Sequence, residues 1–184
     1  MSETDLVPTP SQTIGPFYHF ALTADARQAS LAGETARGER CRLVCRVFDG
    51  EGAPVDDAMI ELWQADAGGN YNPDPVFRGF GRLATDQAGA CEFETVKPGR
   101  VPAPGGGLQA PHVSVSIFAR GLLERLATRI YFSGDAANAE DPVLALVPEH
   151  RRATLLAHLD ARRPGAWIFE IRLSGDRETV FFEV

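Results

Sequence analysis

Short strand-like segments, separated by turns rich in Gly, Pro and Asp, follow one another along most of this chain. Within a segment such as 110–118, apolar residues alternate with polar ones, as in a strand with one buried face. From Cys41 onward, a turn comes roughly every eight to twelve residues. We therefore predict an all-β fold, a two-sheet antiparallel β-sandwich with an extended N-terminal arm and one or two short helices.

The strands are predicted from runs of apolar and β-branched residues that are bounded by turn signals. Only a short turn separates 78–86 from 91–96, so we expect these two segments to form a hairpin-like pair. The full set of predicted strands is 41–49, 58–66, 78–86, 91–96, 110–118, 128–132, 166–174 and 179–184.

Two segments have the features of short helices. Residues 23–31 can form one, with Thr23 as its N-cap. Residues 148–159 can form the other, because their leucines make an apolar stripe that follows a charged first turn.

The length of 184 residues suits one domain with a well-buried core. We predict a single domain over 1–184, with an N-terminal arm at 1–22 and the β-sandwich at 40–184. The arm is expected to be extended because its prolines discourage a helix. From the residues alone, two interpretations stay open: a loop packed on its own domain, or an arm that reaches the pocket of a neighbouring chain.

Charge and cysteine usage limit the compartment and the partners. The chain has 18 basic and 25 acidic residues, a net charge of −7, which argues against nucleic acid as the main partner. No apolar run approaches the length that spans a bilayer, and the N-terminus lacks the profile of a secretory signal, so we expect a cytoplasmic protein. Cys41, Cys45 and Cys91 have no metal-binding spacing and are expected to be buried reduced thiols.

The stretch Lys97–Arg120 joins a loop rich in Pro and Gly to the predicted strand 110–118. Side chains two apart on a strand lie on one face, about 7 Å apart, so His112 and Ser114 point to the same side. Histidines at both positions would offer two imidazoles to one metal ion. Only the first is His, so the strand has the geometry of a metal-binding strand and half of its ligands.

Four patches follow one another along the chain: TPSQTIGPFY, ELWQADAGGNY, TVKPG and APHVSVSIFARG. Together with the closing TVFFEV they resemble the intradiol ring-cleavage dioxygenases, in the same order and over nearly the whole chain. In that family a mononuclear ferric ion is held by two tyrosines and two histidines. Phenolate oxygens stabilise a hard Fe(III), and the imidazoles complete a site with positions open for a catecholate.

Carried over onto this sequence, the family's ligand positions fall on Tyr71, Val101, His112 and Ser114. Val101 has no donor atom, and the neutral hydroxyl of Ser114 is a poor ligand. The resemblance therefore implies four vestigial ligand positions and no metal in this chain. Without a ligand role, Tyr71 is a loop tyrosine and His112 is a hydrogen-bonded strand histidine.

In this loss of ligands, the sequence resembles one of the two chains that make up some members of the family. In those members only the other, homologous β chain binds Fe(III). The other chain completes the substrate pocket with its arm and an arginine, and these residues fall here on Thr13, Gly15, Phe17 and Arg120. The resemblance implies a hetero-oligomer that uses O₂ to open 3,4-dihydroxybenzoate, giving 3-carboxy-cis,cis-muconate. This chain alone is expected to be inactive. Phe17 stands where such chains usually have Tyr, which removes any hydroxyl role there.

Two other functions stay open at this point. The chain is alternatively a self-sufficient dioxygenase of another catechol, or a transthyretin-like β-sandwich that serves only as a binding module. Metal analysis of the isolated chain distinguishes a self-sufficient dioxygenase from an iron-free subunit. The matches at Gly15 and Arg120 argue against a chain that is only a binding module. If Arg120 lines no substrate pocket, it has only a structural role at the end of a strand. Trp63 and Trp167 are expected to be core or interface aromatics.

Overall fold

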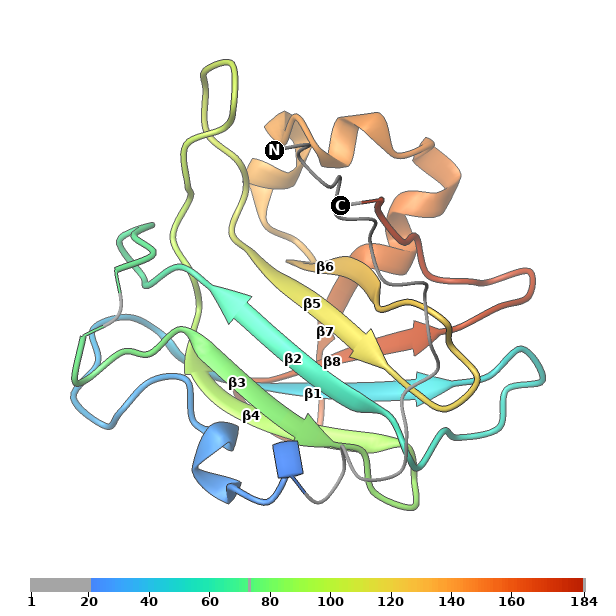
Figure 1. The fold of residues 1–184 in the computed structure, drawn as a ribbon. Helices are drawn as coiled ribbons and strands as arrows, with labels where there is room; N and C mark the ends of the chain where they lie inside the picture. The colour runs from blue at the N-terminus through green and yellow to red at the C-terminus, as the bar shows by residue number, and fades with distance from the viewer. Residues whose placement is uncertain (1–20, 73, 184) are drawn as a thin grey trace, which may run out of the picture.

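The computed structural model describes residues 21–72 and 74–183, and the all-β fold is confirmed (Figure 1). Eight strands and four short 3₁₀ helices form the regular structure of these ranges. The strands are β1 (Arg40–Phe48), β2 (Met59–Gln64), β3 (Phe80–Ala84), β4 (Ala90–Val96), β5 (His112–Phe118), β6 (Leu126–Phe132), β7 (Leu156–Leu159) and β8 (Ala166–Arg172). The helices are η1 (Ala26–Ala29), η2 (Ala136–Glu140), η3 (Leu144–Leu146) and η4 (Glu149–Leu155).

All eight strands belong to one sheet, in the order β3-β2-β5-β6-β7-β8-β1-β4. Its two four-stranded halves are joined where β6 pairs with β7, through Tyr131 with Leu156 and Phe132 with Ala157. The prediction of two separate antiparallel sheets is therefore not confirmed. The sheet is nearly closed and barrel-like, and the pairs β1–β8 and β6–β7 are parallel. Alternation of apolar residues indicates which side chains are buried, but it does not identify a strand's partner or direction.

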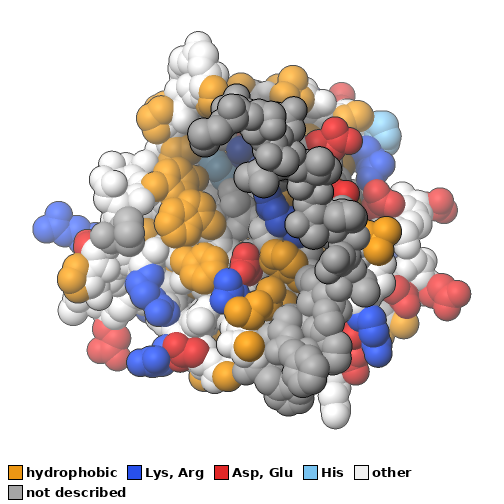
Figure 2. Space-filling view, viewed as in Figure 1, with side chains coloured by type: hydrophobic (Ala, Val, Ile, Leu, Met, Phe, Trp, Pro, Cys, Tyr) orange, Lys and Arg blue, Asp and Glu red, His pale blue; other side chains and the backbone are white. Residues whose placement is uncertain are grey.

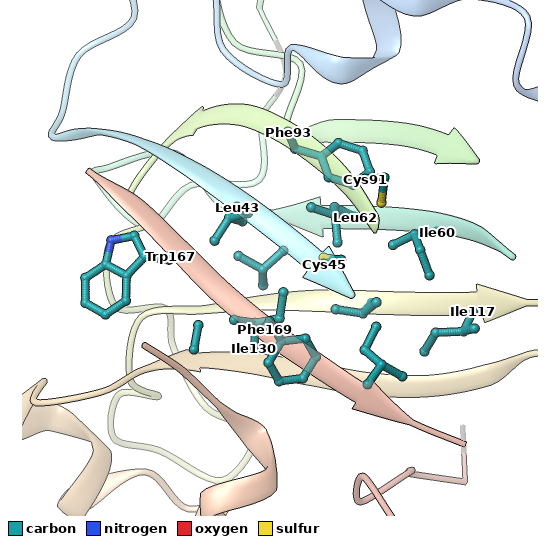
Figure 3. Packing of buried hydrophobic residues seen from close by; sticks show 14 of the residues in the cluster. Leu43, Cys45, Ile60, Leu62, Cys91, Phe93, Ile117, Ile130, Trp167 and Phe169 are labelled. Atoms are coloured by element: carbon teal, nitrogen blue, oxygen red, sulfur yellow. The ribbon is translucent and has the colours of Figure 1, made fainter. Parts of the chain in front are cut away.

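The core lies between the two halves of the sheet, which face each other. Figure 1 shows β2, β3 and β5 in front of β1 and β8, and Figure 3 shows the side chains that fill the space between them. On β5 the core residues are Val113, Val115 and Ile117, which meet β1 and β8 residues in one buried cluster. Trp167 is buried there and meets Phe132 edge-on, with ring centroids 5.1 Å apart.

The three cysteines are buried and unpaired, as expected. Cys45 lies opposite Cys91 in the pairing of β1 with β4. Burial raises the pKa of the Cys41 thiol to about 12. The three buried thiols act as small apolar side chains, and the raised pKa leaves Cys41 with little nucleophilic character at neutral pH.

The expected hairpin of 78–86 with 91–96 is wrong. β3 pairs with β2 and β4 pairs with β1, so the two strands form opposite edges of the sheet. The backbone of Leu31 lies between these edges: its N–H donates to Glu94 O at 2.9 Å, and its carbonyl accepts from Arg78 N at 2.9 Å. A Cβ at Gly81 would lie only 2.5 Å from Leu31 Cδ1, so this strand position has to be glycine for the leucine to enter. Leu31 thus fills the seam that the strands leave open.

Both predicted helices are shorter than expected. In 23–31 only η1 is helical, and its N-cap is Asp25, whose side chain accepts from Arg27 N, in place of Thr23. The segment that follows η1 leaves the helix because its backbone pairs with β4 and with the residues before β3.

The second predicted helix, 148–159, ends early at Leu155. The next four residues form β7, which pairs with β6 and β8. The leucine stripe was therefore misleading: Leu155 is fully buried, whereas Leu159 is 59% exposed. Two free strand edges satisfy this backbone better than another helical turn would.

The predicted strand at 179–184 is also wrong over the part that the structure describes. Phe182 makes one isolated bridge to Ala127, with its N–H donating to the carbonyl at 2.8 Å. Thr13, Gly15 and Phe17 lie outside the described residues. Within those residues, no helix combines the length and the apolar character that a membrane crossing requires.

Candidate functional site

Three of the four predicted ligand positions, Tyr71, His112 and Ser114, lie on the side of β2, β5 and β6 that faces away from the core. Trp63 lies opposite Ser114, and Ser114 lies opposite Arg129. Directly opposed residues of antiparallel strands share a face, so these three side chains form a row across the sheet. His112 lies opposite Tyr131 on the same face. Figure 2 shows hydrophobic side chains gathered on the side of the molecule that β2, β3 and β5 present to the viewer.

Tyr71 reaches this row from the loop after β2. Its ring stacks on Trp63, with centroids 5.9 Å apart and planes inclined by 13°. Asp66 shapes the loop, because its Oδ1 accepts from the N–H groups of Gly68 and Asn70 at 2.8 and 2.9 Å. Gly69 has a φ of +81°, and a Cβ there would collide with the carbonyl of Arg100, so the loop fits closely against the backbone of Gly99 and Arg100.

The phenol of Tyr71 keeps its proton at neutral pH. Burial raises the pKa of Tyr71, and the positive charge of Arg129 only partly opposes this effect. The side chain is 37% exposed at the protein surface. Tyr71 is therefore a stacked, exposed loop tyrosine in this chain.

His112 is a buried strand histidine that makes a hydrogen bond, which agrees with the environment predicted for it from the sequence. Its Nδ1 lies 2.8 Å from Ala110 O, and because a carbonyl only accepts, this nitrogen carries the proton. The ring packs at an angle on Tyr131, with centroids 5.9 Å apart. Burial lowers the pKa of His112, so the imidazole is neutral at physiological pH.

Asp141 is a structural residue of the site that the sequence did not reveal. It is buried, and its Oδ1 accepts from Tyr131 Oη at 3.2 Å and from the N–H groups of Val143 and Leu144 at 2.9 and 2.7 Å. Its Oδ2 accepts from Ala110 N at 2.7 Å, which fixes the chain just before His112. The only sequence signal is the Asp141–Pro142 pair, a common start of a turn.

Val101 is buried and apolar and offers no donor. Its carbonyl accepts from Gln109 N at 2.8 Å, and Gln109 Oε1 accepts from Arg129 at 2.7 Å. Gln109 therefore connects the loop position of Val101 to the arginine on β6. No sequence pattern indicates a role for Gln109 or for Arg129, which belongs to the predicted strand 128–132.

These residues do not fit a ferric ion. Tyr71 and His112 retain donor atoms, Val101 has none, and Ser114 offers only a neutral hydroxyl. A guanidinium, which never loses its charge, lies among them. Within 21–72 and 74–183, no cluster of three or more His, Cys, Asp or Glu side chains is suited to hold a metal ion.

Arg120 lies apart from this group. β5 ends at Phe118, so Arg120 belongs to the turn that follows, roughly 20 Å along the strand from His112. Its Nε pairs with Asp57 Oδ2 at 3.0 Å, and 81% of its side chain is exposed. The guanidinium is thus held by one carboxylate and accessible to solvent. It lies at the opposite end of β5 from the predicted ligand positions His112 and Ser114.

Comparisons with known proteins agree with this description. The profile of the family described as Dioxygenase matches residues 13–175. The protocatechuate 3,4-dioxygenase alpha chain of Burkholderia cepacia is 44% identical over 200 residues, a match that covers 98% of this chain and 100% of that one. A protocatechuate 3,4-dioxygenase beta chain of Burkholderia cepacia is 33% identical over 181 residues, covering 90% of this chain and 75% of that one.

The fold has a counterpart among solved structures. The dioxygenase domain of a dioxygenase–carbohydrate-binding protein fusion from Streptomyces sp. SirexAA-E superposes with a TM-score of 0.65 at 27% identity, covering 92% of this chain and 99% of that one. The family profile spans most of this chain, and both similarities extend over nearly its full length. This chain belongs to the intradiol ring-cleavage dioxygenase family.

Proposed function

We propose that this chain is the iron-free α subunit of a protocatechuate 3,4-dioxygenase, and that a homologous β chain carries the Fe(III). The observation that carries the proposal is the end-to-end match to an alpha chain, at 44% identity, against 33% for a beta chain. The donor set supports it, because Val101 and Ser114 leave the ligand positions incomplete and Arg129 adds a positive charge among them.

The reaction is the intradiol cleavage of 3,4-dihydroxybenzoate to 3-carboxy-cis,cis-muconate, in which both atoms of O₂ enter the product. The ferric ion of the β chain supplies the activation of the catechol toward O₂. This chain binds and orients the part of the substrate that the metal does not contact, and it excludes water from the pocket.

Arg120 binds the substrate carboxylate in this proposal. A guanidinium matches the planar geometry of a carboxylate and stays charged at any working pH. Arg120 is far from the vestigial ligand positions of its own chain and open to a neighbour, so the pocket that it completes belongs to the partner. Thr13, Gly15 and Phe17 of the N-terminal arm line the same pocket.

The assembly is a cytoplasmic hetero-oligomer, which suits the three unpaired thiols. Reconstitution tests the proposal: the chain is produced with and without a β chain, and oxygen uptake with protocatechuate is measured. We expect activity only from the mixture, together with co-purification of the two chains. A β chain that is fully active without this chain would contradict the proposal.

A further inference from the structure

Arg129 lies on β6 next to the predicted vestigial ligand positions of β5. It is the direct cross-strand partner of Ser114. Ser114 also lies opposite Trp63, on which Tyr71 stacks, and it shares its face of β5 with His112. Arg129 is linked to the fourth position, Val101, through Gln109. A single guanidinium therefore lies among these positions.

The guanidinium is held firmly in this place. Gln109 is buried, its N–H donates to Val101 O at 2.8 Å, and its side-chain amide donates to Pro102 O at 3.0 Å. Its Oε1 is thereby aimed at Arg129, which donates to it at 2.7 Å. The other end of the side chain is fixed by the β6 backbone, which pairs with β5 along its length.

Within 21–72 and 74–183, no carboxylate forms an ion pair with this cation. None of the ion pairs within the described part of the chain includes Arg129. Its partner Gln109 is a neutral amide, and its side chain is only partly exposed. The carboxylate of Asp141 also acts on His112 and Tyr131, but it is bound to Tyr131 and to backbone N–H groups rather than to Arg129, so it compensates the positive charge only in part.

We infer that Arg129 itself excludes iron from this chain, by filling the space between the ligand positions and by repelling a cation there. The missing donor atoms at Val101 and Ser114 are then not the only reason that this chain does not bind iron. Restoring a tyrosine and a histidine at these positions is not enough to create a metal site. The inference concerns this chain alone, so it stands or falls independently of the substrate and the partner proposed above.

Restoring the ligands with and without Arg129 tests the inference. The full-length variants V101Y/S114H and V101Y/S114H/R129Q are loaded with ferrous iron without oxygen and then exposed to air. Bound iron and the visible absorption of a tyrosinate–Fe(III) site are measured. We expect stoichiometric, coloured iron only in the variant with R129Q, because Gln is neutral and shorter.

Two further variants serve as controls in the V101Y/S114H background. R129K keeps the positive charge and is expected to exclude iron. R125Q removes an arginine that precedes β6 and contacts Ser116 Oγ on the same hairpin, and it is also expected to leave iron excluded. Thermal melting shows which variants are folded.

Iron in V101Y/S114H at the level of the R129Q variant would overturn the inference, because the guanidinium would then be no barrier. A folded V101Y/S114H/R129Q variant without iron would overturn it as well. If the tyrosine substitution prevents folding, S114H is compared with S114H/R129Q for Zn²⁺ affinity, since Val101 then stays in place. We expect Arg129 removal to tighten Zn²⁺ binding by about 10-fold or more, and equal affinities would refute the inference.

Discussion

Two arginines near the β5–β6 hairpin have opposite environments. Arg129 is partly buried beside a neutral amide and faces the vestigial ligand positions of its own chain. Arg120 is exposed in the turn after β5 and pairs with Asp57. The same side chain can thus close one site and complete another, because its charge is permanent and its surroundings decide what that charge meets.

Arg120→Ala is expected to lower kcat/KM for protocatechuate by about 10- to 150-fold in the reconstituted enzyme, because a charge-assisted hydrogen bond is worth roughly 1.5–3 kcal/mol. Catechol, which has no carboxylate, should lose far less. The matched control is Asp57→Asn, which removes the present partner of Arg120 and keeps the guanidinium. Equal losses with both substrates would show that Arg120 is structural.

At the scale of the elements, the sequence located the strands better than it paired them. The alternation of β5 and the apolar runs of β1 and β8 match their burial. The pairing of β3 with β2, and of β7 with β6, depends on contacts between distant residues that no local pattern encodes. The leucines at 155–159 illustrate this limit, because the tertiary pairing of β7 overrides a helical period.

The seam between β3 and β4 gives a test of the fold. Leu31 is fully buried there, so Leu31→Ala is expected to lower the free energy of unfolding by about 2–5 kcal/mol. Leu146→Ala is the matched control, because that side chain is 82% exposed. Denaturant unfolding measures both variants. A change at Leu31 no larger than the change at Leu146 would contradict its role in closing the sheet.

Lys97 connects the loop before β5 to the helical segment after β6. Its Nζ lies 2.9 Å from Asp135 Oδ2 and also lies 5.3 Å from the Phe132 ring centroid. Burial by itself would raise the pKa of Asp135, but the hydrogen bonds from Lys97 and Ala137 N outweigh it and leave the pKa below its ordinary value of 3.8. A lowered pKa in the folded state stabilises the protein above pH 3.8, and this contribution is lost as the pH falls through the lowered value.

Lys97→Met should therefore reduce stability by about 1–2 kcal/mol at neutral pH, a figure discounted for the partial exposure of the pair. The difference from the unmodified chain should narrow as the pH falls below 3.8, where Asp135 takes up its proton. Denaturant unfolding across this range measures it. A difference that is independent of pH would mean that the ring contacts of Lys97 carry the effect.

At the scale of the whole molecule, the resemblance of four sequence patches identified the family and predicted four vestigial ligand positions. It did not reveal Arg129, Gln109 or Asp141, because their importance comes from cross-strand register and buried hydrogen bonds. The single sheet is likewise a property of the assembled chain. Short sequence motifs identify the metal-ligand positions of the family. The residues around those positions, such as Arg129, Gln109 and Asp141, are identified only from the three-dimensional structure.

Deleting residues 1–17 is expected to damage the activity of the reconstituted enzyme far more than the thermal stability of this chain. In the proposed assembly these residues belong to the partner's pocket, and their prolines lower the entropy lost on docking. Activity assays and thermal melts compare the two losses. Parallel losses would show that the arm supports its own domain.

Iron content and visible absorption, measured on this chain purified alone, show directly whether it is iron-free. We expect a colourless chain without stoichiometric iron and without tyrosinate–Fe(III) absorption, because Val101 and Ser114 interrupt the ligand set and Arg129 lies among the four positions. Purified with a β chain, the complex should be coloured, with its iron in the β chain. A coloured, iron-replete and active homo-oligomer of this chain would contradict the account.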